Sequence, residues 1–124
     1  MEDFFYKKVI AYQKAKGLAV FIYSLVKKFP DYERHGLCDQ IRRAVISIPS
    51  NIAEGMGRMA VRERVHFLEN AYGSLTEVTC QMDIAQSLGF ITDEELRQVE
   101  KYASELGMIM SGLRKSLIDK IQKN

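Results

Sequence analysis

Several features that would narrow the class of this protein at once are scarce or missing. There are two prolines, at positions 30 and 49, and the glycines are mostly single, with no low-complexity tract. The longest apolar run covers residues 18–26, less than half of the roughly 20 residues that a membrane-spanning helix needs. The chain opens with acidic rather than basic residues, so we read no signal peptide. We therefore expect a cytoplasmic protein with no membrane partner.

Signals for metal binding and catalysis are missing as well. Cys38 and Cys80 stand alone, 42 residues apart, without metal-ligand spacing, and both are expected to be buried and reduced. Glu63 and His66 match a Glu-x-x-His motif once, but arginines flank the pair and no second copy exists. Neither His35 nor His66 has a nearby nucleophile arrangement. We predict no catalytic residue, no metal and no cofactor, and hence no enzyme.

Net charge is small, and its distribution says more than its sum. The chain carries +2 overall, but residues 1–64 hold 12 basic and 7 acidic residues, whereas residues 65–124 hold 6 basic and 9 acidic ones. This asymmetry indicates a basic face, or two faces that attract each other in an oligomer. Ordinary scatter of charges over a solvated surface is the alternative.

Apolar residues at helical spacing are abundant. Apolar residues spaced three and four positions apart recur in four segments. These are residues 4–28, a segment from residue 31 or 37 to residue 56, residues 60–87 and residues 92–117. Four amphipathic helices joined by short turns predict an all-α fold, an antiparallel up-and-down four-helix bundle in a single domain over 1–124. No strand-like alternation competes, and no internal repeat supports a helical-repeat architecture.

Residues with special backbone roles mark these helices. Asp31 is read as an N-cap of the second helix, unless an irregular segment precedes it, and Gly55 and Gly57 are expected to stop that helix. Thr92 and Glu95 form a capping box that opens the fourth helix. In the third helix, Gly73 costs up to ~1 kcal/mol against alanine, and close approach of another helix backbone is expected to compensate.

The second helix combines a proline with a polar stripe. Pro49 cannot donate to the preceding turn, so we expect a kink near residues 45–49 or two abutting helical pieces. Spacings of three, four, four and three place five polar residues on one side, namely Gln40, Arg43, Ser47, Asn51 and Glu54. We expect this stripe to satisfy backbone groups at the kink and to contact the third helix near Gly73 and Glu77. A polar seam at a subunit interface is an equal alternative.

The segment 18–26 is apolar almost all the way round the first helix. The outer helix of a monomer would show a polar face there. The segment is therefore predicted to be buried on a second side or, as we favour, to contact another subunit.

Three stretches resemble a known family: residues 40–44 (QIRRA), 47–55 (SIPSNIAEG) and 71–77 (AYGSLTE). They are similar to motifs of the bacterial 23S rRNA-intervening-sequence proteins, also called the S23 ribosomal protein family, and the likeness covers nearly the whole chain. The resemblance implies a four-helix bundle that forms a ring, typically a homopentamer, in a family not known as enzymes. It extends distantly to the accessory variability protein of diversity-generating retroelements, a basic pentamer that binds nucleic acid and a reverse transcriptase.

The chain also departs from the family pattern. Ala60 stands where a serine or threonine is common, so a side-chain cap for the third helix is missing. Arg64 replaces a common aromatic residue, and His66 a common basic one. Together with the weak net charge, these departures lower the expectation of strong, general nucleic-acid binding but leave the fold unaffected.

Two sets of arginines are candidates for binding nucleic acid. Arg58, Arg62 and Arg64 cluster at the turn between the second and third helices, and Arg42 and Arg43 precede the proline. Arginine clusters suit phosphate backbones, and a ring would repeat them.

A structural interpretation competes for both sets. For Arg42 and Arg43 we favour pairing with Glu77 or Glu54 inside the bundle. For residues 58–64, binding and simple solvation stay open as equal alternatives.

The predicted function is a non-enzymatic, oligomeric protein that binds nucleic acid, RNA rather than DNA, or serves as a scaffold. The alternative is an adaptor ring that recruits another protein, such as a nucleic-acid enzyme or a ribosome-associated factor, without binding nucleic acid itself. Its partners are predicted to be further copies of itself, with RNA or DNA or such a protein as the second partner.

Overall fold

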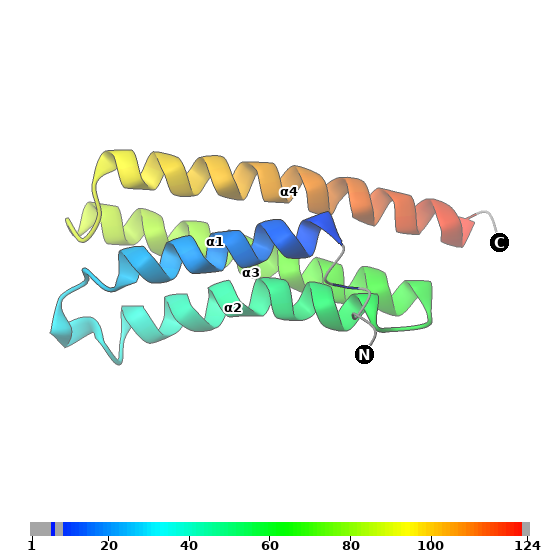
Figure 1. Cartoon of the computed structure of the whole chain (residues 1–124), viewed down its shortest axis with the longest axis horizontal. Helices are drawn as coiled ribbons and strands as arrows, with labels where there is room; N and C mark the ends of the chain where they lie inside the picture. Colours follow the sequence, from blue (N-terminus) through cyan, green and yellow to red (C-terminus); the bar gives the residue numbers. More distant parts are fainter. Residues whose placement is uncertain (1–5, 7–8, 123–124) are drawn as a thin grey trace.

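A computed structural model describes Tyr6 and residues 9–122. The four α-helices are α1 (Ile10–Val26), α2 (Leu37–Met56), α3 (Val61–Ser87) and α4 (Asp93–Gln122), and a short 3-10 helix, η2 (Asp31–Glu33), precedes α2. No strand occurs among the described residues. Each helix runs antiparallel to the next, and α4 returns beside α1 (Figure 1). The predicted all-α, antiparallel four-helix bundle is confirmed.

One apolar core runs along the bundle, and every helix contributes to it. The largest side chains that are fully buried include Leu18, Ile22, Ile41, Ile48, Ile52, Leu68, Met82, Leu106 and Met110. These residues lie at the three- and four-residue spacings that the sequence shows, because only one stripe of each helix can face the bundle axis.

The helices differ in length, so the two ends of the bundle differ as well. α1 has 17 residues and α4 has 30, which correspond to roughly 26 and 45 Å of helix. The C-terminal part of α4 and the start of α3 therefore project beyond α1, at the end where α2 turns into α3 (Figure 1).

The first helix begins later than the periodicity predicts. The predicted start at residue 4 lies outside the described residues, but Val9 is extended, with φ −77° and ψ 125°, so α1 begins at Ile10. Val9 makes no side-chain cap. Apolar spacing continues across this boundary, and it cannot by itself show where the backbone changes conformation.

The predicted N-cap of the second helix is wrong. Asp31 opens η2 instead, and α2 begins at Leu37 after Gly36, whose φ of −106° and ψ of −107° are not helical. The alternative of an irregular opening before residue 37 is thus the correct one.

Pro49 is buried inside α2, and the helix runs unbroken from Leu37 to Met56. Two abutting helical pieces are therefore not formed, and the bend at Pro49 stays a prediction. Of the two glycines expected to stop the helix, Gly57 does so as the C-cap, with a right-handed φ of −84°, whereas α2 continues past Gly55.

The close approach expected at Gly73 of α3 occurs instead at Gly55 of α2. An added Cβ at Gly73 would meet no atom within 4 Å, so no other backbone approaches it and that prediction is wrong. A Cβ at Gly55 would lie 2.9 Å from the Cβ of Phe67 and 3.4 Å from the carbonyl oxygen of Arg64. The close approach of α2 to α3 is therefore at Gly55.

The junction between α3 and α4 follows its sequence signals. Gly89 ends α3 with a left-handed φ of 79°, and the Phe90 N–H donates to the Ala85 carbonyl at 2.9 Å. The Thr92 N–H donates to Glu95 Oε1 at 2.9 Å, and the Glu95 N–H donates to Thr92 Oγ1 at 3.0 Å. This is the predicted capping box.

The cysteines differ in their surroundings. Cys38 is buried as predicted, and its burial raises the pKa of the thiol. Cys80 is exposed on α3, so its predicted burial is wrong.

Candidate nucleic-acid interface

The turn between α2 and α3 is built around Arg58. Its Nη2 donates to Glu54 Oε1 at 2.8 Å, one helical turn earlier, and its guanidinium carbon lies 4.8 Å from the centre of the Phe67 ring. This cation–π contact and the ion pair fix the side chain across the turn. Arg58 is therefore first of all a structural residue, which the sequence showed only as part of a basic cluster.

Arg64 stabilises the same turn from α3. Its Nε donates to the Arg58 carbonyl oxygen at 2.6 Å, and this oxygen belongs to the backbone that leaves α2. Because α3 has no side-chain cap at Ala60, as predicted, this contact from Arg64 is one of the few polar bonds across the junction. Arg64 too has a structural role.

Arg62 differs from its two neighbours. It is exposed, and among the described residues it forms no ion pair. Together with Val65 it lines a groove of about 370 Å³ beside the last turns of α4, where Ile118 and Gln122 lie. Of the three arginines predicted at this turn, Arg62 has the guanidinium most open to a ligand.

The other two predicted arginines lie elsewhere. Arg43 precedes Arg58 by 15 residues of α2, or roughly 22 Å of helix. Arg42 Nη1 pairs with Asp39 Oδ1 at 3.1 Å, within the same helix. The favoured pairing with Glu54 or Glu77 is wrong, because Glu54 pairs with Arg58, and Arg43 is exposed with no ion pair among the described residues.

The polar stripe of α2 does contact α3, as predicted. Asn51 Nδ2 donates to the carbonyl oxygen of Ser47 at 2.8 Å and to its Oγ at 2.9 Å. Ser47 Oγ then lies 2.8 Å from Ser74 Oγ, next to Gly73. Since Ser47 accepts from Asn51, its own hydrogen is available to Ser74. We call the line of contacts from this serine pair to Gly55 and Phe67 the α2–α3 seam.

Further along α3, two residues extend this polar line. Gln81 is 6% exposed, and its Nε2 donates to Glu77 Oε2 at 3.3 Å, while its Oε1 is buried with no hydrogen-bond partner among the described residues. Glu77 was expected beside the stripe, but Gln81 was missed, because a glutamine at a core position looks like any exposed polar residue. Gln40, at the other end of the stripe, is exposed.

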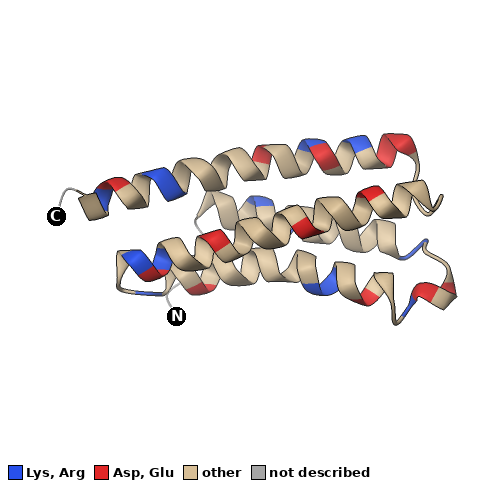
Figure 2. Ribbon diagram, turned by 180° about the vertical axis from the view of Figure 1, so that it is seen from behind, with Lys and Arg blue, Asp and Glu red and all other residues tan. Residues whose placement is uncertain are grey.

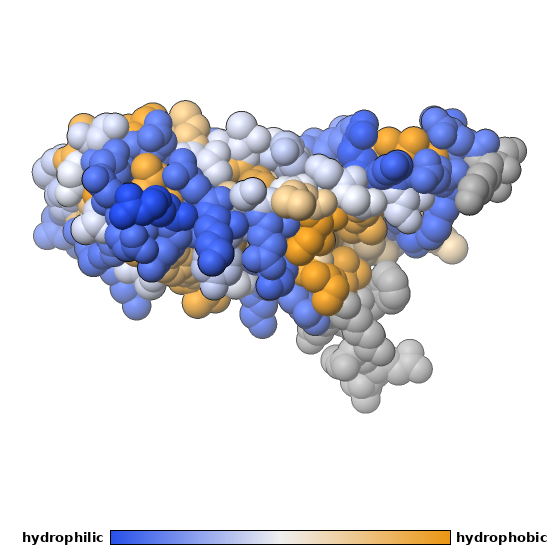
Figure 3. Space-filling view, turned by 90° about the horizontal axis from the view of Figure 1, so that it is seen from above, coloured by the Kyte–Doolittle hydropathy of each residue, from blue (hydrophilic) through white to orange (hydrophobic). Residues whose placement is uncertain are grey.

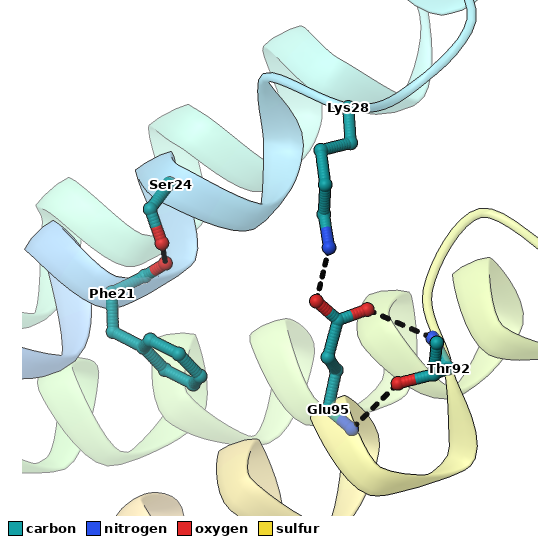
Figure 4. A network of polar contacts seen from close by, with 5 residues as sticks. All are labelled: Phe21, Ser24, Lys28, Thr92 and Glu95. Atoms are coloured by element: carbon teal, nitrogen blue, oxygen red, sulfur yellow. Dashed lines mark hydrogen bonds and ion pairs between the residues drawn. The ribbon is translucent and has the colours of Figure 1, made fainter.

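A second set of polar contacts joins α1 to α4. Lys28 bonds to Glu95, whose carboxylate also accepts the Thr92 N–H of the capping box (Figure 4). The bond from Lys28, together with that N–H, lowers the pKa of Glu95. Further along α1, Lys14 Nζ lies 2.8 Å from Glu105 Oε1, and this carboxylate raises the pKa of Lys14.

Charge is spread unevenly along the molecule. Figure 2 shows residues of both signs at each end, with lysines and arginines near the α2–α3 turn and in the C-terminal part of α4, and acidic residues most evident where η2 lies and α4 begins. Near the turn, Arg114 Nη2 bridges to Glu69 at 2.7 Å, whereas Lys115 is exposed without an ion pair among the described residues. Lys115 precedes Ile118, which lines the groove beside Arg62, by three residues, so Lys115 lies on the same face of α4 as that groove.

Two other kinds of site have no support within the described part of the chain. No three histidine, cysteine, aspartate or glutamate side chains gather as metal ligands. No helix there is long and apolar enough to cross a membrane.

Fold and site together define an antiparallel four-helix-bundle protein with a basic end. The sequence pattern of the 23S rRNA-intervening sequence proteins matches residues 7–112, and this chain belongs to that family. No curated protein matches its sequence. A solved structure that resembles it is a protein of unknown function from the S23 ribosomal protein family of Bacteroides thetaiotaomicron VPI-5482, with a TM-score of 0.79, 20% identity, and coverage of 86% of this chain and 96% of that one. At that identity the likeness supports the fold.

Proposed function

We propose that this protein is a non-enzymatic, oligomeric nucleic-acid-binding protein of the cytoplasm, with RNA as the better ligand. The observation that carries the proposal is Arg62, which is exposed, has no ion pair among the described residues and lies beside the basic C-terminal part of α4. Arg58 and Arg64 hold the turn in place, so Arg62 stands on a rigid support. Such an arrangement suits a phosphate backbone, which a guanidinium can contact with two parallel hydrogen bonds.

Names within the family favour RNA over DNA. The name of the family refers to 23S rRNA intervening sequences, and the similar solved structure is of a protein from the S23 ribosomal protein family. The two or three cations of a single copy bind nucleic acid weakly. We propose that the copies assemble into a ring, a pentamer, in which the weak sites of all copies contribute to the overall affinity. Arg43 would then be a second, more distant contact.

Binding to a labelled, structured RNA tests the proposal, with fluorescence anisotropy as the measurement. Reversing two cations, as Arg62→Glu with Lys115→Glu, is expected to weaken binding at least about tenfold at ~50 mM salt and to lower the slope of log K against log salt by about 1–2. Arg58 and Arg64 are unsuitable for this test, because their loss would also disturb the α2–α3 turn.

The matched control is Arg97→Glu with Lys101→Glu, which changes the same charge at the opposite end of α4. It should retain most of the binding. If it weakens binding as much as the first pair does, only net charge matters and the interface is wrong. Failure of the wild-type protein to bind either RNA or DNA at ~50 mM salt would contradict nucleic-acid binding altogether.

A second candidate is an adaptor that recruits a nucleic-acid enzyme or a ribosome-associated protein. Exposed apolar side chains favour it, since Val20 is 66% and Met108 74% exposed. Pull-down from native lysate separates the two functions: a stoichiometric protein that survives nuclease treatment favours the adaptor, and its loss with the nucleic acid favours direct binding.

A further inference from the structure

α1 and α2 leave an apolar groove uncovered on their outer side. Val20 is 66% and Ile46 44% exposed, and with Pro49 and Ala53 they line a groove of about 370 Å³. Lys16 is the one charged residue among the described residues that line it. We call this surface the α1–α2 groove. It contains the outer side of the segment 18–26, which the sequence predicts to be covered by something other than its own bundle.

A second groove lies between α3 and α4 and has a volume of about 590 Å³. Its floor and walls are mostly small or uncharged residues such as Thr76 and Ser104, and its one charged residue among the described lining residues is Glu100. Two larger side chains stand at its edge, Met108 with 74% and Tyr72 with 46% exposed. We call this surface the α3–α4 groove.

The two grooves lie on opposite sides of the bundle. Helices contact one another in the cyclic order α1, α2, α3, α4, so the α1–α2 pair and the α3–α4 pair form opposite flanks. Both flanks expose apolar side chains near the middle of the molecule, away from the charged ends. Figure 3 gives a view from the side of α4, in which hydrophilic residues cover much of the surface and apolar ones form one larger patch and smaller ones toward both ends.

The flanks also differ in charge. Residues 10–58, which contain α1 and α2, hold eight basic and four acidic residues, whereas residues 61–122, which contain α3 and α4, hold seven basic and ten acidic ones. Lys16 in one groove and Glu100 in the other repeat this difference locally. A surface that is complementary to each groove is thus present on the same chain.

We propose that the α3–α4 groove of one copy docks onto the α1–α2 groove of a second copy, with Met108 seated between Val20 and Ile46. Methionine suits this role, because its flexible side chain fills an irregular gap. The attraction between Lys16 and Glu100 favours this pairing over like flanks. The contact is heterologous, so an open chain of copies as a whole keeps one free groove of each kind, one at either end, until the ring closes. This assignment rests on the self-association proposed above and is independent of nucleic-acid binding.

Two variants that each destroy one groove test the assignment. Val20→Asp places a carboxylate in the α1–α2 groove, and Met108→Asp places one at the edge of the α3–α4 groove. Both side chains are exposed, so the fold should persist, as circular dichroism can verify. In light scattering after size exclusion, each variant alone is expected to be monomeric at a concentration at which the wild type is oligomeric.

An equimolar mixture of the two variants is the decisive sample. Val20→Asp retains an intact α3–α4 groove and Met108→Asp an intact α1–α2 groove, so the mixture is expected to form a one-to-one dimer that cannot grow. A mixture that stays monomeric would overturn the pairing of unlike flanks. So would a variant that still assembles like the wild type.

The control is Met59→Asp, which makes the same chemical change at a residue that is 94% exposed in the α2–α3 turn and lines neither groove. It should assemble normally, and its dissociation would contradict the proposed surfaces. A wild-type protein that is monomeric at micromolar concentration would overturn both self-association and this assignment, whereas loss of RNA binding alone would leave both in place.

Discussion

The α2–α3 seam and the contact between α1 and α4 show two different ways to join helices. α2 and α3 approach so closely that Gly55 has no room for a Cβ beside Phe67, and neutral side chains bond across them at Ser47 and Ser74. α1 and α4 meet through the ion pairs of Lys14 and Lys28, with an open groove of about 520 Å³ alongside them. We call this second contact the α1–α4 seam.

This difference between the two seams indicates which helix pair forms the rigid part of the bundle. Close packing and hydrogen bonds between half-buried groups are sensitive to small changes in shape, because a core cannot absorb an extra methyl group without movement. Exposed ion pairs contribute little, since water and salt screen them. We therefore expect α2 and α3 to form the rigid unit that carries the basic turn, and α1 to be the helix most easily displaced from α4.

Substitution of the two glycines of the α2–α3 pair should give the largest contrast. Gly55→Ala is expected to destabilise the protein by about 1–3 kcal/mol, because the new Cβ would lie 2.9 Å from the Cβ of Phe67. Gly73→Ala adds the same methyl group where no atom lies within 4 Å, so it should stabilise by up to ~1 kcal/mol through helix propensity. Urea denaturation measures both. Equal effects of the same sign would show that Gly55 is not the point of close approach.

The serine pair should give a smaller effect. Ser47→Ala and Ser74→Ala are each expected to cost about 1 kcal/mol, and the double variant should cost less than the sum, because both remove the same hydrogen bond. Ser50→Ala, an exposed serine of the same helix, is the control and should stay within about 0.5 kcal/mol of the wild type. Strict additivity in denaturation experiments would mean that the two hydroxyls do not interact across the helices.

These two seams also show how far the sequence alone could lead. The four helices and the capping box of Thr92 and Glu95 were predictable, because apolar spacing and caps are local signals. The helical spacing of the polar stripe that contains Ser47 and Asn51 predicted correctly that this stripe contacts α3. By contrast, the close approach was predicted at Gly73 rather than at Gly55, because both glycines lie inside helices and only the rotation of each helix about its axis decides which one faces a neighbour.

The contacts of the arginines in the candidate site were even harder to predict from the sequence. Nothing local indicates that Arg58 stacks on Phe67 or that Arg64 donates to a backbone carbonyl, since long side chains have many conformations and find partners only in the folded turn. The predicted partners of Arg42 across the bundle were wrong for the same reason, because Asp39 lies nearer within its own helix. Only the structure shows that Arg62, alone of the three turn arginines, forms neither an ion pair nor a side-chain hydrogen bond within the part of the chain that it describes.

The α1–α4 seam should respond least to mutation but in a characteristic way to pH. Lys28 and the Thr92 N–H lower the pKa of Glu95 from its ordinary value of 4.5. The folded state therefore favours the charged carboxylate, and this contribution is present above pH 4.5 and lost as the pH falls through the lowered pKa. Glu95→Gln is expected to lower stability at neutral pH by at most about 1 kcal/mol, as for other exposed ion pairs, and the difference from wild type should vanish in acid.

Thermal unfolding of wild type and Glu95→Gln between about pH 7 and 3 measures this convergence. Glu94→Gln is the matched control, because it removes a charge from the same first turn of α4 and breaks only the exposed pair with Arg97 of the same helix, while Glu94 contacts neither Lys28 nor the Thr92 N–H. If both variants differ from wild type in the same way, the helix dipole rather than the α1–α4 seam accounts for the effect. If only Glu95→Gln converges with wild type in acid, Lys28 and Glu95 do join α1 to α4, and high salt should weaken the same difference at neutral pH.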